Sequence, residues 1–397
     1  MCIHKYIYIY IYIYIYMRNN DNVLYPFHLH LLQIMDLLNL ATESFQSIAI
    51  SSALFLFTGY LVYVRYRRYE YLNSIIKKYP DPKVVLENHD IAMEIYSHIF
   101  RKEFPLFARS SLEFALFKPF ATPSVSKLLV STREFLDRCP RRAEDTELIL
   151  SEIIDPYPRI ENQRLVTPHI SEKEIMKQYE RREASIRRLN ELHGKYPISN
   201  EDYLYTLVLF VVEPLRWINN WEWRKLDIRE VNAIFKVWHE IGTKMNIKDI
   251  PDTLEEWYVI QKEYVESSVK YHPANWTCAD PTIKHLGKKL PGFMLPVVYK
   301  MLPCLLEKSE CDAFGISTAS LLMRIIFNTL ICLRAWFIRY LCLPRKVFDL
   351  RTPFHANEQG KYVPHYFVYD PPIYKDGYRI EELGPEKFMP KCPVFHG

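Results

Sequence analysis

The chain has 397 residues, of which 49% are hydrophobic, so it is long and apolar enough to bury a sizeable core. This composition excludes an intrinsically disordered protein. The net charge of +4 is small beside 51 basic and 47 acidic residues, and no Lys/Arg stripe interleaves with aromatic residues, which excludes a nucleic-acid-binding function.

Glycine and proline usage favours helices. The chain has 10 glycines, roughly a third of ordinary usage, and 26 prolines. Tight hairpin turns should therefore be rare and helix boundaries frequent, unlike in a β-sandwich. The eight cysteines form no CxxC pair and no Cys/His cluster with zinc spacing. We therefore expect free thiols in a reducing compartment.

Residues 5–16 alternate isoleucine and tyrosine with a period of two, a pattern that is formally typical of a strand. The run has no turn partner, and alternating AT triplets encode Ile and Tyr, so a translated dinucleotide repeat explains it better. We therefore expect the natural protein to begin at Met17 or Met35 rather than at Met1. Residues 1–34 are accordingly interpreted as a non-native or disordered leader.

Residues 47–64 form an uncharged stretch of 18 residues, close to the roughly 20 that cross a bilayer as a helix. Asp36 and Glu43 precede it, whereas arginines follow at positions 65, 67 and 68. This order disfavours a cleaved signal peptide, and by the positive-inside rule it leaves the part after Arg65 in the cytosol. We predict a single-pass transmembrane helix, with a buried core helix as the alternative.

After a proline-bounded linker at residues 79–82, amphipathic patterns predict helices over residues 83–101 and 124–138. The apolar stretch 104–129 is broken by prolines and is not a membrane span. Residues 140–168 contain charged residues and more prolines, and we predict that they form an irregular connection across the core.

Three helices with explicit end signals follow. The first runs from Ser171, which begins an S-x-x-E capping box, to Gly194. The second opens at Ser199, continues through an apolar run, and ends or kinks near Pro214. The third opens at Asp227. Short loops join the three, as in an antiparallel helical bundle.

Residues 316–343 are strongly apolar but contain three arginines, and each arginine costs about 2.5 to 3.5 kcal/mol at the centre of a bilayer. We therefore predict a membrane-surface helix or a core helix here, and not a second span. Residues 346–397 are predicted to form an irregular tail. The whole pattern predicts an all-α fold, with a helical bundle over residues 80–345 behind an N-terminal transmembrane helix.

His193 continues the apolar stripe of the first of the three helices. A lone histidine on such a face is more often a satisfied core residue than a ligand. Haem iron, however, can be held by a single protein imidazole, so no second ligand with metal spacing is needed. Arg187 and Arg188 precede His193 and could pair with haem propionates, with a solvated helix face as the alternative.

Glu213 ends an apolar run and precedes Pro214, so a carboxylate stands where a buried helix should stay apolar. Burial without a partner would raise its pKa and suit proton transfer. The alternative is a structural salt bridge to Arg216 or Arg224. Four tryptophans lie nearby, and they suit a flat macrocycle or prenyl chain as well as a plain core: Trp217, Trp221, Trp223 and Trp238.

Several blocks within roughly residues 80–260 resemble one known family. They are residues 111–117, 123–129, 188–193, 198–207, 210–217, 222–224 and 238–242. The family is the fungal ER-bound oxygenase mpaB family, which is similar to the catalytic domain of bacterial rubber oxygenases, also called latex clearing proteins.

The resemblance implies an all-helical domain with one b-type haem on a proximal histidine. It implies cleavage of an isoprenoid carbon–carbon double bond by dioxygen, with a prenylated, apolar substrate reached at the endoplasmic-reticulum membrane. His193 matches the histidine of the shared R-x4-H pattern, Arg188 matches its arginine, and Glu213 matches the family's Glu-Pro pair.

Two alternatives stay open. Bacterial members often have a Trp-Val-His triplet in the following helix, where this chain has Leu209, Phe210 and Val211, so His239 is a second candidate for the iron ligand. A haem-free, membrane-anchored helical protein that binds or scaffolds lipids would have the same composition. A hydrolase is excluded because no G-x-S-x-G motif is present.

Overall fold

The computed structural model describes residues 24–288, 291–369 and 371–389. The Ile/Tyr run at residues 5–16 and the expected start at Met17 lie outside these residues. The chain divides into two compact units, one up to Arg65 and one from Tyr66 onward. Throughout the described residues the regular elements are helices, and the only β feature is an isolated bridge between Tyr362 and Tyr378. The predicted all-α fold is confirmed.

The helical part of the first unit belongs to α2 (Leu24–Lys78). The segment Leu32–Lys78 of this helix has a mean hydropathy of 1.8 and contains the predicted span at residues 47–64. By length and composition it can cross a membrane. Residues 47–60 are all solvent-exposed in the structure, so this stretch is not a buried core helix.

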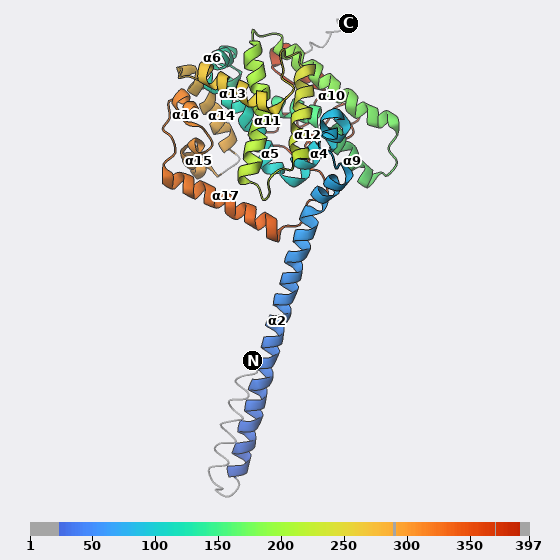
Figure 1. The fold of residues 1–397 in the computed structure, drawn as a ribbon, viewed down its shortest axis with the longest axis vertical. Coiled ribbons are helices and arrows are strands. Elements are labelled where there is room, and N and C mark those ends of the chain that lie inside the picture. Colours follow the sequence, from blue (N-terminus) through green and yellow to red (C-terminus); the bar gives the residue numbers. More distant parts are fainter. Residues whose placement is uncertain (1–23, 289–290, 370, 390–397) are drawn as a thin grey trace. The chain divides into compact units, whose positions relative to one another are not determined.

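The second unit is a helical bundle, shown in Figure 1. Prolines stand in the first turn of many of its helices, where the missing N–H costs nothing. Its first half contains α3 (Val84–Glu87), α4 (His89–His98), a π-helical turn (Ile99–Glu103), α5 (Pro105–Phe117), η2 (Lys118–Ala121), α6 (Pro123–Thr132), α7 (Glu134–Asp137), α8 (Cys139–Ile154) and α9 (Pro156–Val166).

The prediction of an irregular connection over residues 140–168 is wrong. Helices α8 and α9 cover most of this range, and both begin with proline in the first turn. Pro140 and Pro156 therefore mark helix starts and not breaks, because proline at that position has a φ angle that already suits the helix. The apolar stretch after residue 104 is divided in the same way by Pro105, Pro119 and Pro123.

The three helices with explicit end signals form as predicted. They are α10 (Glu172–His193), α11 (Asn200–Trp221) and α12 (Ile228–Lys244). Ser171 and Asp227 form capping boxes with the glutamates three residues on, and the Ser199 side chain caps α11. Helix α11 does not end at Pro214 but continues one and a half to two turns beyond it.

The remaining elements complete the bundle. They are α13 (Leu254–Ser268), α14 (Pro273–Gly287), η3 (Gly292–Met294), α15 (Leu295–Met301), η4 (Leu302–Cys304), α16 (Lys308–Phe314), α17 (Leu321–Leu341), η5 (Ile380–Glu382) and η6 (Glu386–Phe388). The six described cysteines are free thiols, which agrees with the expectation from their spacing.

Helix α11 is the central helix of the bundle and packs against α5, α12 and α13 (Figure 1). Its apolar run 207–212 is buried on all sides, which explains why that run is continuous and not striped. The crossing with α12 is close at Gly242, where an added Cβ would lie 2.3 Å from a methyl carbon of Leu207. Any larger residue at Gly242 would force the side chain of Leu207 to move.

Candidate active site

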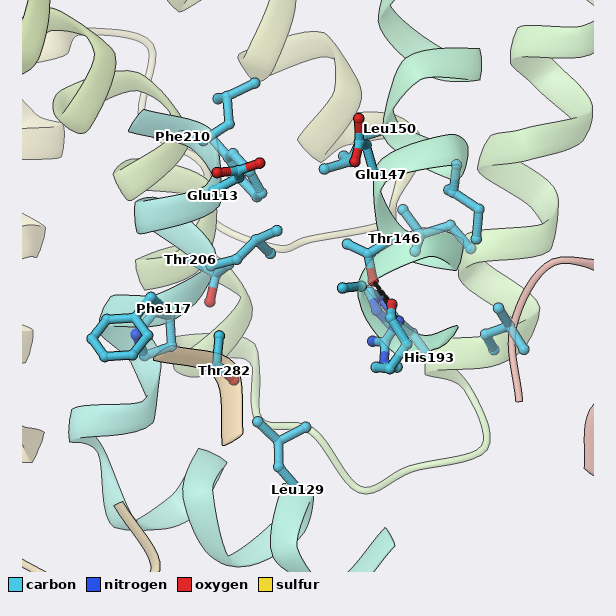
Figure 2. Close-up of a pocket in the computed structure, with 18 of the residues that line it drawn as sticks. Glu113, Phe117, Leu129, Thr146, Glu147, Leu150, His193, Thr206, Phe210 and Thr282 are labelled. Atoms are coloured by element: carbon cyan, nitrogen blue, oxygen red, sulfur yellow. Dashed lines mark hydrogen bonds between the residues drawn. The ribbon is translucent and has the colours of Figure 1, made fainter. Parts of the chain in front are cut away.

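A cavity of about 360 Å³ lies inside the second unit, a volume within the range of small-molecule sites. Its walls come from α5, α6, α8, α10, α11, α12 and α14, and from the C-terminal segment that contains Arg351, Tyr366 and Tyr369. Most lining side chains are apolar, including Leu129, Leu150 and Phe210 (Figure 2). A cavity of this kind favours an apolar ligand that is fixed by a few polar groups.

His193, the last residue of α10, lies on the cavity wall. Its Nδ1 atom is buried and has no hydrogen-bond partner in the described structure. Burial, helped by the positive charge of Arg142, lowers the pKa of His193 to about 4. The imidazole is therefore neutral at physiological pH, the form in which histidine binds metals.

Arg142 and Thr146 lie on α8, one turn apart on the same wall as His193. The Arg142 Nη1 atom donates a hydrogen bond to Thr146 Oγ1 at 2.7 Å, and the guanidinium lies 5.9 Å from the ring centre of Phe135. Within the described residues Arg142 forms no direct ion pair, although its charge acts on the nearby buried carboxylate of Asp145. Arg142 thus brings a positive charge without a direct ion-pair partner to a largely apolar cavity.

Sequence reasoning missed Arg142 because it lies in the range that was predicted to be irregular. Its signal would have been the four-residue spacing to Thr146, which places both side chains on one face of a helix. Figure 2 shows Thr146 and His193 on one side of the cavity and Thr206 and Phe117 on the opposite side. Side chains from α8 and α10 therefore form one polar wall, and α5 and α11 form the facing wall.

A second polar group on the cavity wall is an ion-pair network. Arg109 pairs with Glu113 at 3.2 Å and with Glu147 at 2.8 Å, and Arg351 also pairs with Glu147 at 2.8 Å. These charges form direct ion pairs with one another, whereas Arg142 forms none within the described residues. His285 also lines the cavity, but its Nε2 atom lies 2.9 Å from the Tyr369 hydroxyl.

Arg187 and Arg188 are not among the residues that line the cavity, so their positions do not favour the predicted contact with haem propionates. Arg188 donates hydrogen bonds to the backbone carbonyls of Leu383 at 2.9 Å and Phe388 at 3.0 Å. It thus holds the C-terminal segment against α10. Arg187 is solvent-exposed, as the alternative of a solvated helix face predicted.

Glu213 is fully buried, but the prediction of an unpartnered carboxylate is wrong. Its oxygens accept hydrogen bonds from Lys118 at 2.7 Å, Arg216 at 2.6 Å and the Trp217 indole at 3.0 Å. Burial raises the pKa of Glu213, but the charges of Lys118 and Arg216 outweigh it, so the pKa is lowered. This is the salt-bridge alternative.

Two consequences follow for the catalytic assignment. Glu213 is not among the residues that line the cavity, and a paired carboxylate of lowered pKa is a poor proton acceptor. The other proposed partner, Arg224, instead pairs with Glu230 at 2.6 Å. The pairing and position of Glu213 therefore favour the structural alternative, within a buried charge cluster that joins η2, α11 and α16 through Lys118 and Glu310.

His239 and the tryptophans are also placed by the structure. His239 lies 3.3 Å from Asp252 and is not among the cavity-lining residues. Trp238 does line the cavity and stacks on Phe210 with a centroid distance of 4.2 Å. The other three tryptophans of the segment lie elsewhere in the structure, so one aromatic residue of the four serves the cavity wall: Trp238, and not Trp217, Trp221 or Trp223.

Comparison with known proteins finds relatives that are named as ER-bound oxygenases. The chain is 28% identical to the ER-bound oxygenase mpaB' of Penicillium brevicompactum over 308 residues, which cover 72% of this chain and 68% of the relative. It is 27% identical to the ER-bound oxygenase mpaB of the same species over 72% of this chain and 67% of the relative. It is 28% identical to the ER-bound oxygenase mpaB of Penicillium roqueforti over 62% of this chain and 84% of the relative. No family model matches the chain.

Proposed function

We propose that the chain is an oxygenase of the mpaB kind, like the relatives that it resembles, and that it binds a b-type haem at His193 and uses dioxygen to cleave a carbon–carbon double bond. The substrate is an isoprenoid, prenylated or lipidic molecule reached at the endoplasmic-reticulum membrane. In this reaction one alkene and one dioxygen molecule give two carbonyl fragments, and each carbon of the cleaved double bond receives one oxygen atom.

The state of His193 carries this proposal. It is a neutral imidazole on the wall of an apolar cavity, and one buried ring nitrogen lacks a hydrogen-bond partner in the described structure. A buried polar atom without a partner is costly, and such atoms often mark a bound group. His285, the other histidine among the described lining residues, has its Nε2 atom 2.9 Å from the Tyr369 hydroxyl and lies outside the R-x4-H pattern that His193 completes. His193 therefore fits the role of the single imidazole ligand of a haem.

Arg142 replaces Arg187 and Arg188 as the proposed partner of a haem propionate. It is a cavity-lining guanidinium close enough to His193 to lower its pKa, and it lacks an ion-pair partner within the described residues. A carboxylate placed there would complete a charge-assisted hydrogen bond. When bound, haem supplies a redox-active iron for dioxygen chemistry, and the protein supplies binding, orientation and electrostatics.

The apolar walls define the substrate class. Leucine and phenylalanine side chains such as Leu129, Leu150, Phe117 and Phe210 would bind a hydrocarbon chain and exclude water. Glu113 and Glu147 are carboxylates on the cavity wall, but both are paired with arginines, so by the argument used for Glu213 they are poor proton acceptors. Glu213 is also paired, and it does not line the cavity.

The relatives and α2 support the proposed membrane location. The relatives are named as bound to the endoplasmic reticulum, and the segment Leu32–Lys78 is long and apolar enough to span a bilayer. We propose that residues 47–64 cross this membrane once and leave the second unit in the cytosol, where an apolar substrate can be taken from the bilayer.

An absorbance spectrum tests the haem assignment. The full chain, purified from cells supplied with a haem precursor, should have a Soret band. His193→Ala should lose it while retaining helical circular dichroism, because an iron ligand is removed but only one side chain at the cavity shrinks. The matched control is His239→Ala, which removes a histidine that pairs with Asp252 outside the cavity and should keep the band.

Other outcomes would decide between the alternatives. If His193→Ala retains haem and His239→Ala loses it, the ligand assignment moves to α12. If the full chain binds no haem at all, the haem-free lipid-binding hypothesis takes its place. Cleavage itself is tested by incubating the protein with a prenylated aromatic compound and dioxygen and detecting the two carbonyl fragments by mass spectrometry.

A further inference from the structure

Helix α17 (Leu321–Leu341) exposes an apolar face that nothing in the described structure covers. It has a mean hydropathy of 1.7, and none of its residues is buried. Large exposed side chains recur along its outer side, and they are Leu321, Leu322, Ile325, Ile326, Leu330, Leu333, Trp336 and Phe337. Their spacing by one, three and four residues places them on one broad face of the helix. A contiguous apolar face of this length normally marks an interaction site.

The opposite side of α17 holds the helix to the bundle. Phe327 makes an edge-to-face contact with Trp221 at 5.6 Å, and Arg334 forms an ion pair with Glu222 at 3.1 Å. The Arg334 guanidinium also lies over the ring of Phe107 at 4.4 Å. The helix is therefore attached by a polar and aromatic inner side, while its apolar side faces outward.

This arrangement contradicts the core-helix alternative and disfavours a second membrane span. A span would place Arg334 well inside the hydrocarbon and would either break its ion pair or carry Glu222 of the bundle with it. A helix that lies in the membrane surface meets neither penalty, because only its outer side enters the bilayer. The helix contains no acidic residue, and its basic residues outside the contact with Glu222 suit anionic headgroups: Arg324 and Arg339, followed by Arg345 and Lys346.

The position of Arg68 indicates that a lipid bilayer covers the exposed apolar face of α17. Its guanidinium donates hydrogen bonds to the backbone carbonyls of Cys342 at 2.7 Å and Leu343 at 3.1 Å, directly after the end of α17. Only three residues separate Arg68 from Val64, the end of the proposed span, and so short a stretch covers at most about 14 Å. This step relies on the proposed membrane anchor.

We propose that α17 is a second, monotopic membrane contact, which lies in the cytosolic surface of a phospholipid bilayer with its outer apolar side in the acyl boundary. The adjoining segment adds to this surface. Turn η4 packs against α17, and the elements before it, η3 and α15, expose Phe293 and Val297 with 80% and 43% of their surface accessible. With two attachments, the second unit would be held at a fixed tilt to the membrane.

Depth-resolved fluorescence quenching tests the proposal on the full chain. A small fluorescent amino acid replaces Leu333 or Leu322, which lie on the same side of α17 about 16 Å apart. The matched control is Leu165, another exposed leucine of the second unit. The protein is reconstituted into phosphatidylcholine and phosphatidylserine vesicles whose lipids carry a quencher either near the headgroup or deep in the acyl chain.

We expect both α17 positions to lose most of their emission to the shallow quencher, and to the same extent, while position 165 loses none. A comparison of the wild type with Trp336→Phe gives the same readout from a native residue and keeps the test valid where a substituted protein fails to fold.

Three results would overturn the proposal. Quenching of position 333 only by the deep lipid, with position 322 shallow, would mean that α17 spans the bilayer. Blue-shifted emission that neither lipid quenches would mean that protein covers the face, as in a second copy of the chain. Emission typical of water would mean that nothing covers it. None of these readouts depends on haem or turnover, so failure here is separate from failure of the proposed function.

Discussion

At His193 two opposing effects act on the same imidazole. Its place at the C-terminus of α10 favours the protonated form by about 0.3 to 1 kcal/mol through the helix dipole. Burial in the cavity wall and the charge of Arg142 favour the neutral form, and they prevail because the pKa falls from 6.5 to about 4. The cavity therefore keeps a metal-binding form of histidine available across the physiological pH range.

This shift has a consequence for the pH dependence of stability. Between about pH 6.5 and pH 4 the unfolded chain binds a proton at His193 that the folded chain does not bind, so the contribution of this residue to stability falls as the pH falls through that window. We expect the melting temperature of haem-free His193→Gln to decline less than that of the haem-free wild type over this range. Equal declines, measured by circular dichroism, would contradict the lowered pKa.

Arg142 permits a test of the propionate assignment. Arg142→Ala should weaken haem binding by roughly 10- to 100-fold, because a hydrogen bond to a charged group contributes about 1.5 to 3 kcal/mol. Arg142→Lys should recover part of the affinity, since it keeps the charge but not the planar fork. Haem titration of the purified apoprotein measures both. The control is Arg187→Ala, and a larger loss in that variant would restore the assignment to α10.

His193 and Arg142 differ in whether their positions on the cavity wall could be predicted from the sequence. His193 follows an apolar stripe of period 3.6 and ends a helix with a capping box, so its inward direction was predictable from local pattern. Arg142 faces the cavity only because α8 packs against α10, which is a long-range contact that no local pattern contains. Lys118, the partner of Glu213, is 95 positions away in the sequence and was missed for the same reason.

For the helices, the accuracy of the boundaries predicted from the sequence depends on which residues mark those boundaries. Capping side chains act within one turn, so the starts of α10, α11 and α12 were predictable to within a residue. Proline is ambiguous, because the same residue starts one helix and breaks another. It begins α8 and α9, yet Pro214 lies inside α11, where packing of the surrounding helices outweighs the missing hydrogen bond.

The charge cluster around Glu213 joins three of these elements and gives a stability prediction. Lys118 lies 2.7 Å from both Glu213 and Glu310, and all three side chains are buried. Glu213→Gln removes one charge but keeps the shape, so it should lower the free energy of unfolding by an amount approaching the 3 to 5 kcal/mol typical of a broken buried pair. Turnover per bound haem should stay near the wild-type value.

Calorimetry and single-turnover product assays separate the two readings of Glu213. A lowered melting temperature with normal turnover per haem supports the structural role. Normal stability with product formation reduced by 10²- to 10⁴-fold, the range typical for loss of a general base, would instead return Glu213 to the catalytic machinery. Lys118→Met is the control, because it leaves two buried carboxylates without their shared cation and should destabilise the protein more.

In the proposed arrangement, the first compact unit contacts the lipid bilayer and the second lies in the cytosol. The first carries an apolar, exposed stretch in α2, and the second has a closed core around α11. Exposed apolar surface of this extent is stable only against lipid or protein, so α2 is the element that we propose as the membrane anchor. The cavity lies wholly within residues of the second unit, and its chemistry can be assayed separately from its topology.

The orientation of α2 gives the last prediction. Asp36 and Glu43 precede residues 47–64, and Arg65 and Arg67 follow, so the positive-inside rule leaves the second unit cytosolic. Protease added to intact microsomes should therefore degrade everything after Arg65, while a lumenal marker protein survives until detergent is added. Full protection of the second unit would reverse the topology. Replacing Arg65 and Arg67 with asparagine reduces the charge bias and should leave a fraction of chains protected, whereas Arg68 is kept because its hydrogen bonds to the end of α17 serve the fold.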